Sequence, residues 1–116
     1  GEIRIQGYMQ AEFGHLKYYM ARAELELGGG FCDFLLFPER VYHGDVPHSY
    51  IIEMKHSKED ASDAELQARA AEGIEQLRRY AADPLVPALA KGTTLHLVLY
   101  QFKGKQPIRI EEIERL

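Results

Sequence analysis

The sequence predicts an α/β domain in which helices flank a mixed β-sheet of four to five strands. Strand-like apolar runs occur at residues 31–37, 49–55 and 93–102, whereas residues 63–82 repeat their apolar residues with helical spacing. The 116 residues, 46% of them hydrophobic, suit one domain with one core. We therefore expect a single domain over residues 1–116.

The first element expected is an amphipathic helix over residues 7–23. Its apolar residues follow at spacings of four, three and four: Met9, Phe13, Leu16 and Met20. Glu12 lies beside this stripe, either as a solvated helix residue or as part of a site. Both interpretations stay open for Glu12.

A β-hairpin is predicted next. Residues 24–27 alternate charged and apolar side chains, residues 28–30 are three glycines, and residues 31–37 form a second apolar run. Asp33 lies inside that second run, although aspartate is a poor strand former. It either satisfies backbone groups at a strand edge or takes part in chemistry.

The strand at residues 49–55 ends with two opposite charges on one face. Strand periodicity places Ile51, Glu53 and Lys55 on the same side. A buried charge is costly unless it is paired or binds a metal. The pair is therefore either a structural ion pair at a strand end or part of a functional site.

A helix is predicted from residue 63 to about residue 82, with Ser62 as its N-cap and Glu65 three residues later. Gln76 and Tyr80 are one turn apart at the edge of its apolar stripe. They form either a half-buried boundary pair or the rim of a pocket over the sheet. A loop follows, then a strand over residues 93–102 and an edge strand over residues 107–113.

Charge and cysteine content narrow the functional classes. The net charge of −4 and the pI near 5.7 argue against a generally basic nucleic-acid-coating protein, so any such contact is local and metal-assisted. The single cysteine, Cys32, excludes an internal disulfide, and no apolar run approaches the roughly 18 residues of a membrane span. We expect a cytoplasmic setting, no membrane contact, and, because residue 1 is Gly1, a fragment of a longer protein.

Taken together, three segments resemble the PD-(D/E)XK nuclease superfamily, and within it the nuclease-like domain at the C-terminus of certain bacterial AAA-ATPase-like proteins. The first runs from Glu26 through the glycines and Asp33 to residue 36, and the second contains Glu53 and Lys55. The third, Gln76-Leu-Arg-Arg-Tyr80, is similar to the QxxxY element of the RecB-like branch. The resemblance covers about residues 24–102.

This resemblance implies a restriction-endonuclease-like core and a site for Mg²⁺ or Mn²⁺. It assigns metal binding to Asp33 and Glu53, and orientation or activation of the attacking water to Lys55. Supporting roles fall to Gln76, Tyr80, Glu26 and, by a loose alignment with an acid on the first helix, Glu12. Phe31 departs from the pattern, because related sequences often carry arginine there. The implied partners are DNA or RNA and an N-terminal ATPase domain, and a homodimer is one possible assembly.

Three hypotheses follow from the sequence. The first is a metal-dependent nuclease domain that carries Asp33, Glu53 and Lys55 as catalytic residues. The second is a catalytically silent module that keeps the fold and binds nucleic acid or protein. The third is a purely structural or oligomerisation domain in which Glu53 and Lys55 form only an ion pair at a strand end.

Overall fold

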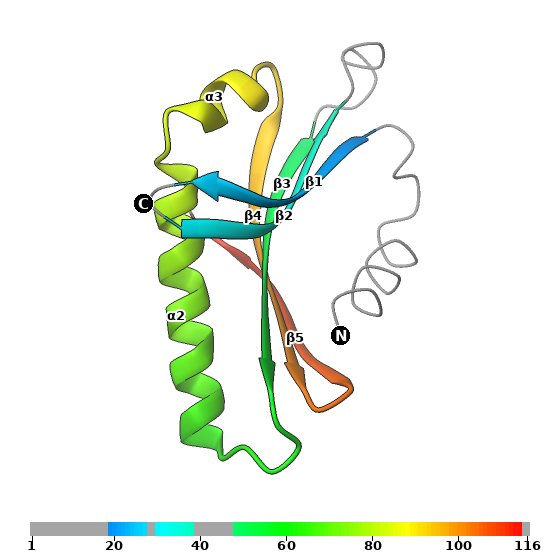
Figure 1. Cartoon of the computed structure of the whole chain (residues 1–116), viewed down its shortest axis with the longest axis vertical. Helices are drawn as coiled ribbons and strands as arrows, with labels where there is room; N and C mark the ends of the chain where they lie inside the picture. The colour runs from blue at the N-terminus through cyan, green and yellow to red at the C-terminus, as the bar shows by residue number, and fades with distance from the viewer. Residues whose placement is uncertain (1–18, 28–29, 39–47, 115–116) are drawn as a thin grey trace.

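The computed structural model describes residues 19–27, 30–38 and 48–114. One five-stranded sheet organises them, and α2 lies along one of its faces (Figure 1). The elements are β1 (Tyr19–Leu27), β2 (Gly30–Pro38), β3 (His48–Ser57), α2 (Asp63–Ala81), α3 (Leu85–Leu89), β4 (Thr94–Lys103) and β5 (Gln106–Ile113). The predicted α/β fold with a mixed sheet is confirmed.

The strand order follows the sequence, and one pair of neighbours is parallel. β1 with β2, β2 with β3, and β4 with β5 are antiparallel, whereas β3 and β4 run parallel from His48↔Thr94 to Ser57↔Lys103. Parallel neighbours need a crossover, which α2 and α3 supply. This crossover is what carries α2 across the sheet.

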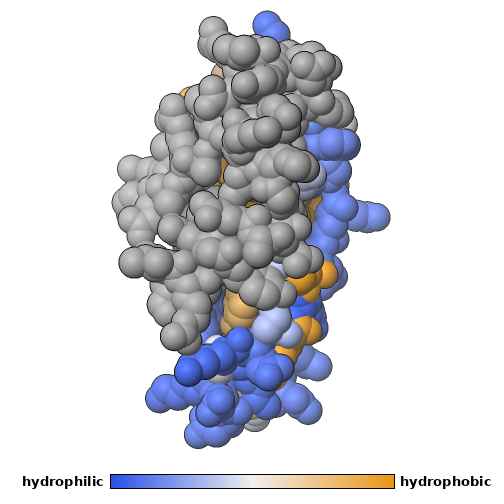
Figure 2. Space-filling model, turned by 90° about the vertical axis from the view of Figure 1, so that its right-hand side faces the viewer, coloured by the Kyte–Doolittle hydropathy of each residue, from blue (hydrophilic) through white to orange (hydrophobic). Residues whose placement is uncertain are grey.

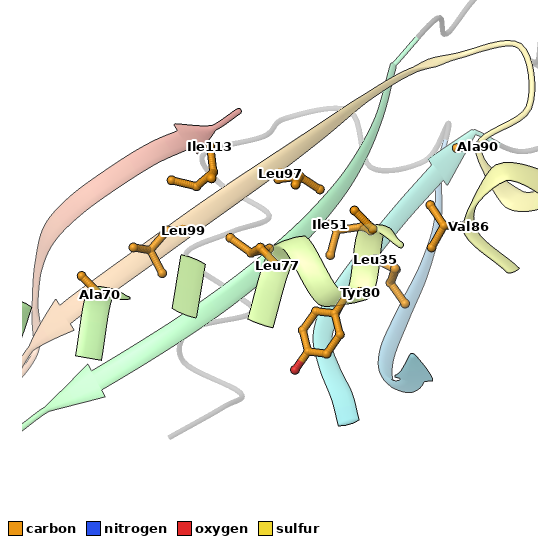
Figure 3. Close-up of a cluster of buried hydrophobic side chains, with 11 residues drawn as sticks. Leu35, Ile51, Ala70, Leu77, Tyr80, Val86, Ala90, Leu97, Leu99 and Ile113 are labelled. Atoms are coloured by element: carbon orange, nitrogen blue, oxygen red, sulfur yellow. The ribbon is translucent and has the colours of Figure 1, made fainter. Parts of the chain in front are cut away.

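The sheet buries apolar side chains on both faces. On the face that α2 covers, Leu35, Ile51 and Leu99 pack with Leu77 and Tyr80 of the helix (Figure 3). A second cluster lies on the opposite face and consists of Leu36, Ile52, Val98, Tyr100 and Phe102. Neighbours such as Ile51 and Ile52 thus belong to different clusters, which confirms the alternation predicted for residues 49–55.

Two expectations about secondary structure are wrong. The helix predicted over residues 7–23 fails over its last five residues, because β1 begins at Tyr19 and pairs there with Pro38 of β2. Strand pairing outweighs the helical spacing of a short segment. Residues 7–18, which include Glu12, lie outside the described residues.

The loop expected after α2 contains the short helix α3, whose Leu85 amide donates to the Asp83 carboxylate at 2.8 Å.

The N-terminus of α2 has the predicted cap. The Ser62 hydroxyl accepts a hydrogen bond from the Glu65 amide at 3.2 Å, and the acidic residues Asp63 and Glu65 lie in the first turn. The cap gives a first-turn amide an acceptor, and the two negative charges interact favourably with the positive N-terminal end of the helix dipole. The cap fixes where α2 begins, and therefore which of its residues lie over β3.

Replacing the cap should destabilise the domain. We expect Ser62→Ala to lower the free energy of unfolding by about 1 kcal/mol, because one amide of the first turn loses its acceptor. Urea denaturation followed by circular dichroism measures this change. Ser62→Asp keeps an acceptor and should remain within a few tenths of a kcal/mol of the parent. Equal losses in both variants would contradict a capping role.

Candidate active site

Glu53 and Lys55 are buried side by side on the α2 face of β3. Glu53 is 3% exposed and Lys55 is 6% exposed. The Lys55 Nζ lies 3.7 Å from Glu53 Oε2. Each charge offsets part of the cost of burying the other. The structure therefore brings these two predicted site residues together.

A third charged residue, Glu72 of α2, completes the surroundings of Lys55. The Lys55 Nζ donates a hydrogen bond to Glu72 Oε1 at 3.3 Å, and Arg69 Nη1 lies 3.6 Å from the other carboxylate oxygen. The Glu72 side chain is half exposed, so Glu53, Lys55 and Glu72 form a row of charged groups from the interior to the surface. Sequence reasoning missed Glu72, although it lies one helical turn before Gln76 and two before Tyr80.

Gly73 makes room for Lys55 beneath the helix. A Cβ atom at this position would lie 2.6 Å from Leu99 Cδ1 and 3.2 Å from Lys55 Cγ. The missing side chain lets α2 approach β3 and β4 closely, and the aliphatic stem of Lys55 uses this space. The sequence signal was a glycine in the middle of the predicted helix.

Gln101 anchors α2 beside the charged residues. It pairs with Lys55 in the parallel β3/β4 register and is 1% exposed. Its Nε2 donates a hydrogen bond to the Leu66 carbonyl of α2 at 2.7 Å. A glutamine in an otherwise apolar strand was the available signal, because a buried amide needs a partner.

Gln76 and Tyr80 differ in depth. Tyr80 is fully buried with Leu35 and Ile51, so it lies deeper than the half-buried boundary position predicted (Figure 3). Gln76 is half-buried, and its Oε1 is buried without a hydrogen-bond partner among the residues that the structure describes. An unsatisfied buried amide oxygen is rare and suits a cation or water ligand. The functional roles of both residues stay predictions.

Asp33 lies on β2, next to the part of the strand that pairs with β3. The described β2/β3 pairing runs from Leu36↔Tyr50 to Phe34↔Ile52 and ends one residue before Asp33 and Glu53. The side chain of Asp33 lies outside the described part of the chain. The same holds for the side chain of Glu26, whose backbone pairs with Phe31. The roles predicted for Asp33 and Glu26 are thus not tested by side-chain geometry.

The described donor atoms suit a hard cation. Among the described side chains, no group of three or more His, Cys, Asp or Glu residues is arranged to hold a metal ion. Glu53 offers a buried carboxylate and Gln76 a buried amide oxygen, and such oxygens are the ligands that Mg²⁺ prefers. A complete site needs a further carboxylate, the role predicted for Asp33.

Comparison with known proteins identifies one family. The model of a family described as the PD-(D/E)XK nuclease superfamily matches residues 1–112. Neither a curated protein nor a solved structure matches the chain with statistical significance. No helix in the described ranges has both the length and the apolar character needed to cross a bilayer.

Filling the space at Gly73 should cost stability. Gly73→Ala improves helix propensity by about 1 kcal/mol, but overpacking a core costs about 1–3 kcal/mol. We therefore expect a net loss of about 1 kcal/mol in the free energy of unfolding, measured by urea denaturation. Glu75→Ala, at an exposed position of the same helix, should cause no comparable loss. Stabilisation by Gly73→Ala would contradict the close approach.

Removing one partner of the buried ion pair should cost more than removing both. Lys55→Met leaves Glu53 buried without this cation, and we expect a loss of about 3 kcal/mol in the free energy of unfolding without metal. The double variant Lys55→Met with Glu53→Gln removes both charges and should recover most of that loss. Thermal or urea unfolding of the three proteins measures the difference. Equal stabilities of the single and double variants would show that the two charges are not coupled.

Proposed function

The chain belongs to the PD-(D/E)XK nuclease superfamily, and on this basis we propose that it is a divalent-metal-dependent nuclease domain. The substrate we propose is DNA, with RNA as the alternative, and the bond hydrolysed is a phosphodiester. One observation carries the proposal: a buried carboxylate and a buried ammonium group lie side by side beneath α2. Buried charges that lie side by side in this way occur at many catalytic sites.

Glu53 and Asp33 are the residues proposed to hold Mg²⁺ or Mn²⁺. The buried amide oxygen of Gln76 is a further donor, either directly or through water. When bound, such an ion lowers the pKa of a coordinated water and offsets the negative charge that develops on the phosphate. Glu53 supplies a carboxylate in a buried setting, where electrostatic interactions are stronger than in water.

Lys55 is the residue proposed to orient the attacking water or a phosphate oxygen. In hydrolysis the water oxygen bonds to phosphorus while one ester P–O bond breaks, and the leaving oxygen gains a proton. An ammonium group is a compact cation that donates hydrogen bonds, which suits the charge formed in this step. Glu72 positions the ammonium group through its 3.3 Å hydrogen bond, and Gly73 admits the stem.

The second candidate is a catalytically silent module that binds nucleic acid or protein. The contacts of Lys55 favour this alternative. Its charge is already compensated by two carboxylates, Glu53 and Glu72, which leaves less of it to act on a water or a phosphate. Phe31 stands where related sequences often carry arginine, and the net charge is −4. An N-terminal ATPase domain as the partner and a cytoplasmic location remain part of the proposal in either case.

Removal of either carboxylate should abolish both metal binding and cleavage. We expect Asp33→Ala and Glu53→Ala to lose the heat signal of Mg²⁺ or Mn²⁺ binding and to reduce metal-dependent cleavage at least a hundredfold. Isothermal titration calorimetry and a cleavage assay on DNA and RNA measure the two effects on the same samples. Glu75→Ala removes an exposed acid of α2 and should behave as the parent.

The outcomes separate the two candidates. Cleavage by the parent that is lost in both variants supports the nuclease. Metal binding without cleavage favours the silent module. Cleavage that is equal in the parent and both variants would rule out this site as the catalytic centre.

A further inference from the structure

The outer edge of β5 has no strand partner in the described part of the chain. β5 is the last strand of the sheet and pairs only with β4 there. Edge strands expose backbone N–H and C=O groups that can pair with another strand, and proteins usually protect them with proline, charges or a covering segment. Pro107 and a register shift in the β4/β5 pairing lie at the start of β5, whereas residues 109–113 pair with β4 without interruption.

Two large apolar side chains stand on this edge. Ile108 is 45% exposed and Ile110 is 50% exposed. Ile110 pairs with Tyr100, whose side chain belongs to the cluster on the face away from α2. Figure 2 shows hydrophobic side chains at the surface on this side of the molecule. An exposed apolar edge strand is a template for strand addition.

The charges of β5 alternate with these isoleucines and complement one another. Arg109 Nη1 lies 3.2 Å from Glu111 Oε2, and both side chains are nearly half exposed. Ile113 packs into the cluster on the α2 face, so Arg109 and Glu111 lie on that face by strand periodicity. An arginine two residues before a glutamate can form two ion pairs with an antiparallel copy of the same strand.

We infer that β5 is an interaction surface for a second copy of this chain, with the two β5 strands antiparallel around a two-fold axis at Ile110. Arg109 of each copy then faces Glu111 of the other, and the two Ile110 side chains face each other. Opposite charges and apolar pairs directly across a strand pair are both stabilising. The pairing extends each five-stranded sheet into a single continuous sheet.

Other symmetric registers are worse. Residues opposite each other in an antiparallel pair share a face, so an axis perpendicular to the sheet must pass through a residue position. An axis at Arg109 brings two arginines together, and an axis at Glu111 or Glu112 brings two glutamates together. An axis at Ile108 sets Pro107 against Arg109 and forms no ion pair. Only the register at Ile110 combines charge complementarity with an apolar centre.

The pairing relates two copies of the candidate active site. Lys55 pairs with Gln101, and Gln101 pairs with Arg109, so the ion pair of the interface lies in the same row as the site. The two-fold axis keeps both α2 helices on one face of the joint sheet. Five strand spacings of about 4.8 Å separate the two β3 strands by about 24 Å. Such a dimer could present both sites to one nucleic acid, an idea that rests on the proposed function. The pairing of the β5 strands does not depend on that function.

Charge reversal with mixing tests the pairing. The parent should show a dimer fraction that rises with concentration in sedimentation velocity, because a strand edge buries less area than a permanent interface. Arg109→Glu and Glu111→Arg each place like charges across the interface, and each should weaken self-association at least tenfold. An equimolar mixture of the two variants again sets opposite charges across the strands and should form a one-to-one dimer.

Both variants lose the ion pair between Arg109 and Glu111 within one strand. A dimer that forms only on mixing therefore reports ion pairs between the two chains. Arg79→Glu makes the same charge change on the exposed surface of α2 but leaves β5 unchanged, so this variant should self-associate as the parent does. Ile110→Lys is a second test, since it brings two cations together at the axis, and circular dichroism confirms folding. A parent that stays monomeric, or β5 variants that dimerise as the parent does, would overturn the inference. Cleavage assays on the same variants report on the proposed function separately.

Discussion

The burial of the Lys55 ammonium group beneath α2 is the constraint on which the described site depends. An isolated charge in the interior is unstable, so Lys55 requires Glu53 on its own strand and Glu72 on the helix. These contacts fix the height of α2 above β3. Gly73 then follows as a packing requirement, because a larger residue would collide with Leu99. The electrostatics of one side chain thus determine the identity of several others.

Much of the fold was predictable because local patterns and tertiary structure agree. Alternation along residues 49–55 predicted which side chains share a face, and Ser62 with Glu65 predicted the start of α2. The helix expected over residues 7–23 is wrong over residues 19–23, because Met20 and its neighbours satisfy a helical spacing yet pair with β2. Single-sequence patterns do not contain that distant partner. The short helix α3 was missed because its five residues are too few for a periodic signal.

The candidate site was predictable where charge and strand periodicity coincide, as they do for Glu53 and Lys55. Glu72 was missed because it looks ordinary on its helix, and Gly73 and Gln101 were missed because an unusual residue in a segment does not show which residue it meets. Their roles arise from the crossover that sets α2 over β3 and β4. Tyr80 was expected at the edge of the apolar stripe, but it lies in the core cluster that also contains Val86 of α3 and Leu35 of the sheet. Such depths depend on the neighbouring elements, which helical periodicity does not specify.

The parallel pairing of β3 with β4 also determines when the site can form during folding. The β1/β2 and β4/β5 pairs join strands that are close in sequence, whereas His48 pairs with Thr94 across the whole of α2 and α3. Closing so long a loop costs entropy before its contacts repay it, and topologies rich in distant contacts fold slowly. Lys55 and Glu72 are only 17 residues apart, whereas Gln101 lies beside Lys55 only after this loop has closed. A partly folded chain with both hairpins intact would therefore still lack the Gln101 anchor of α2 beside Lys55.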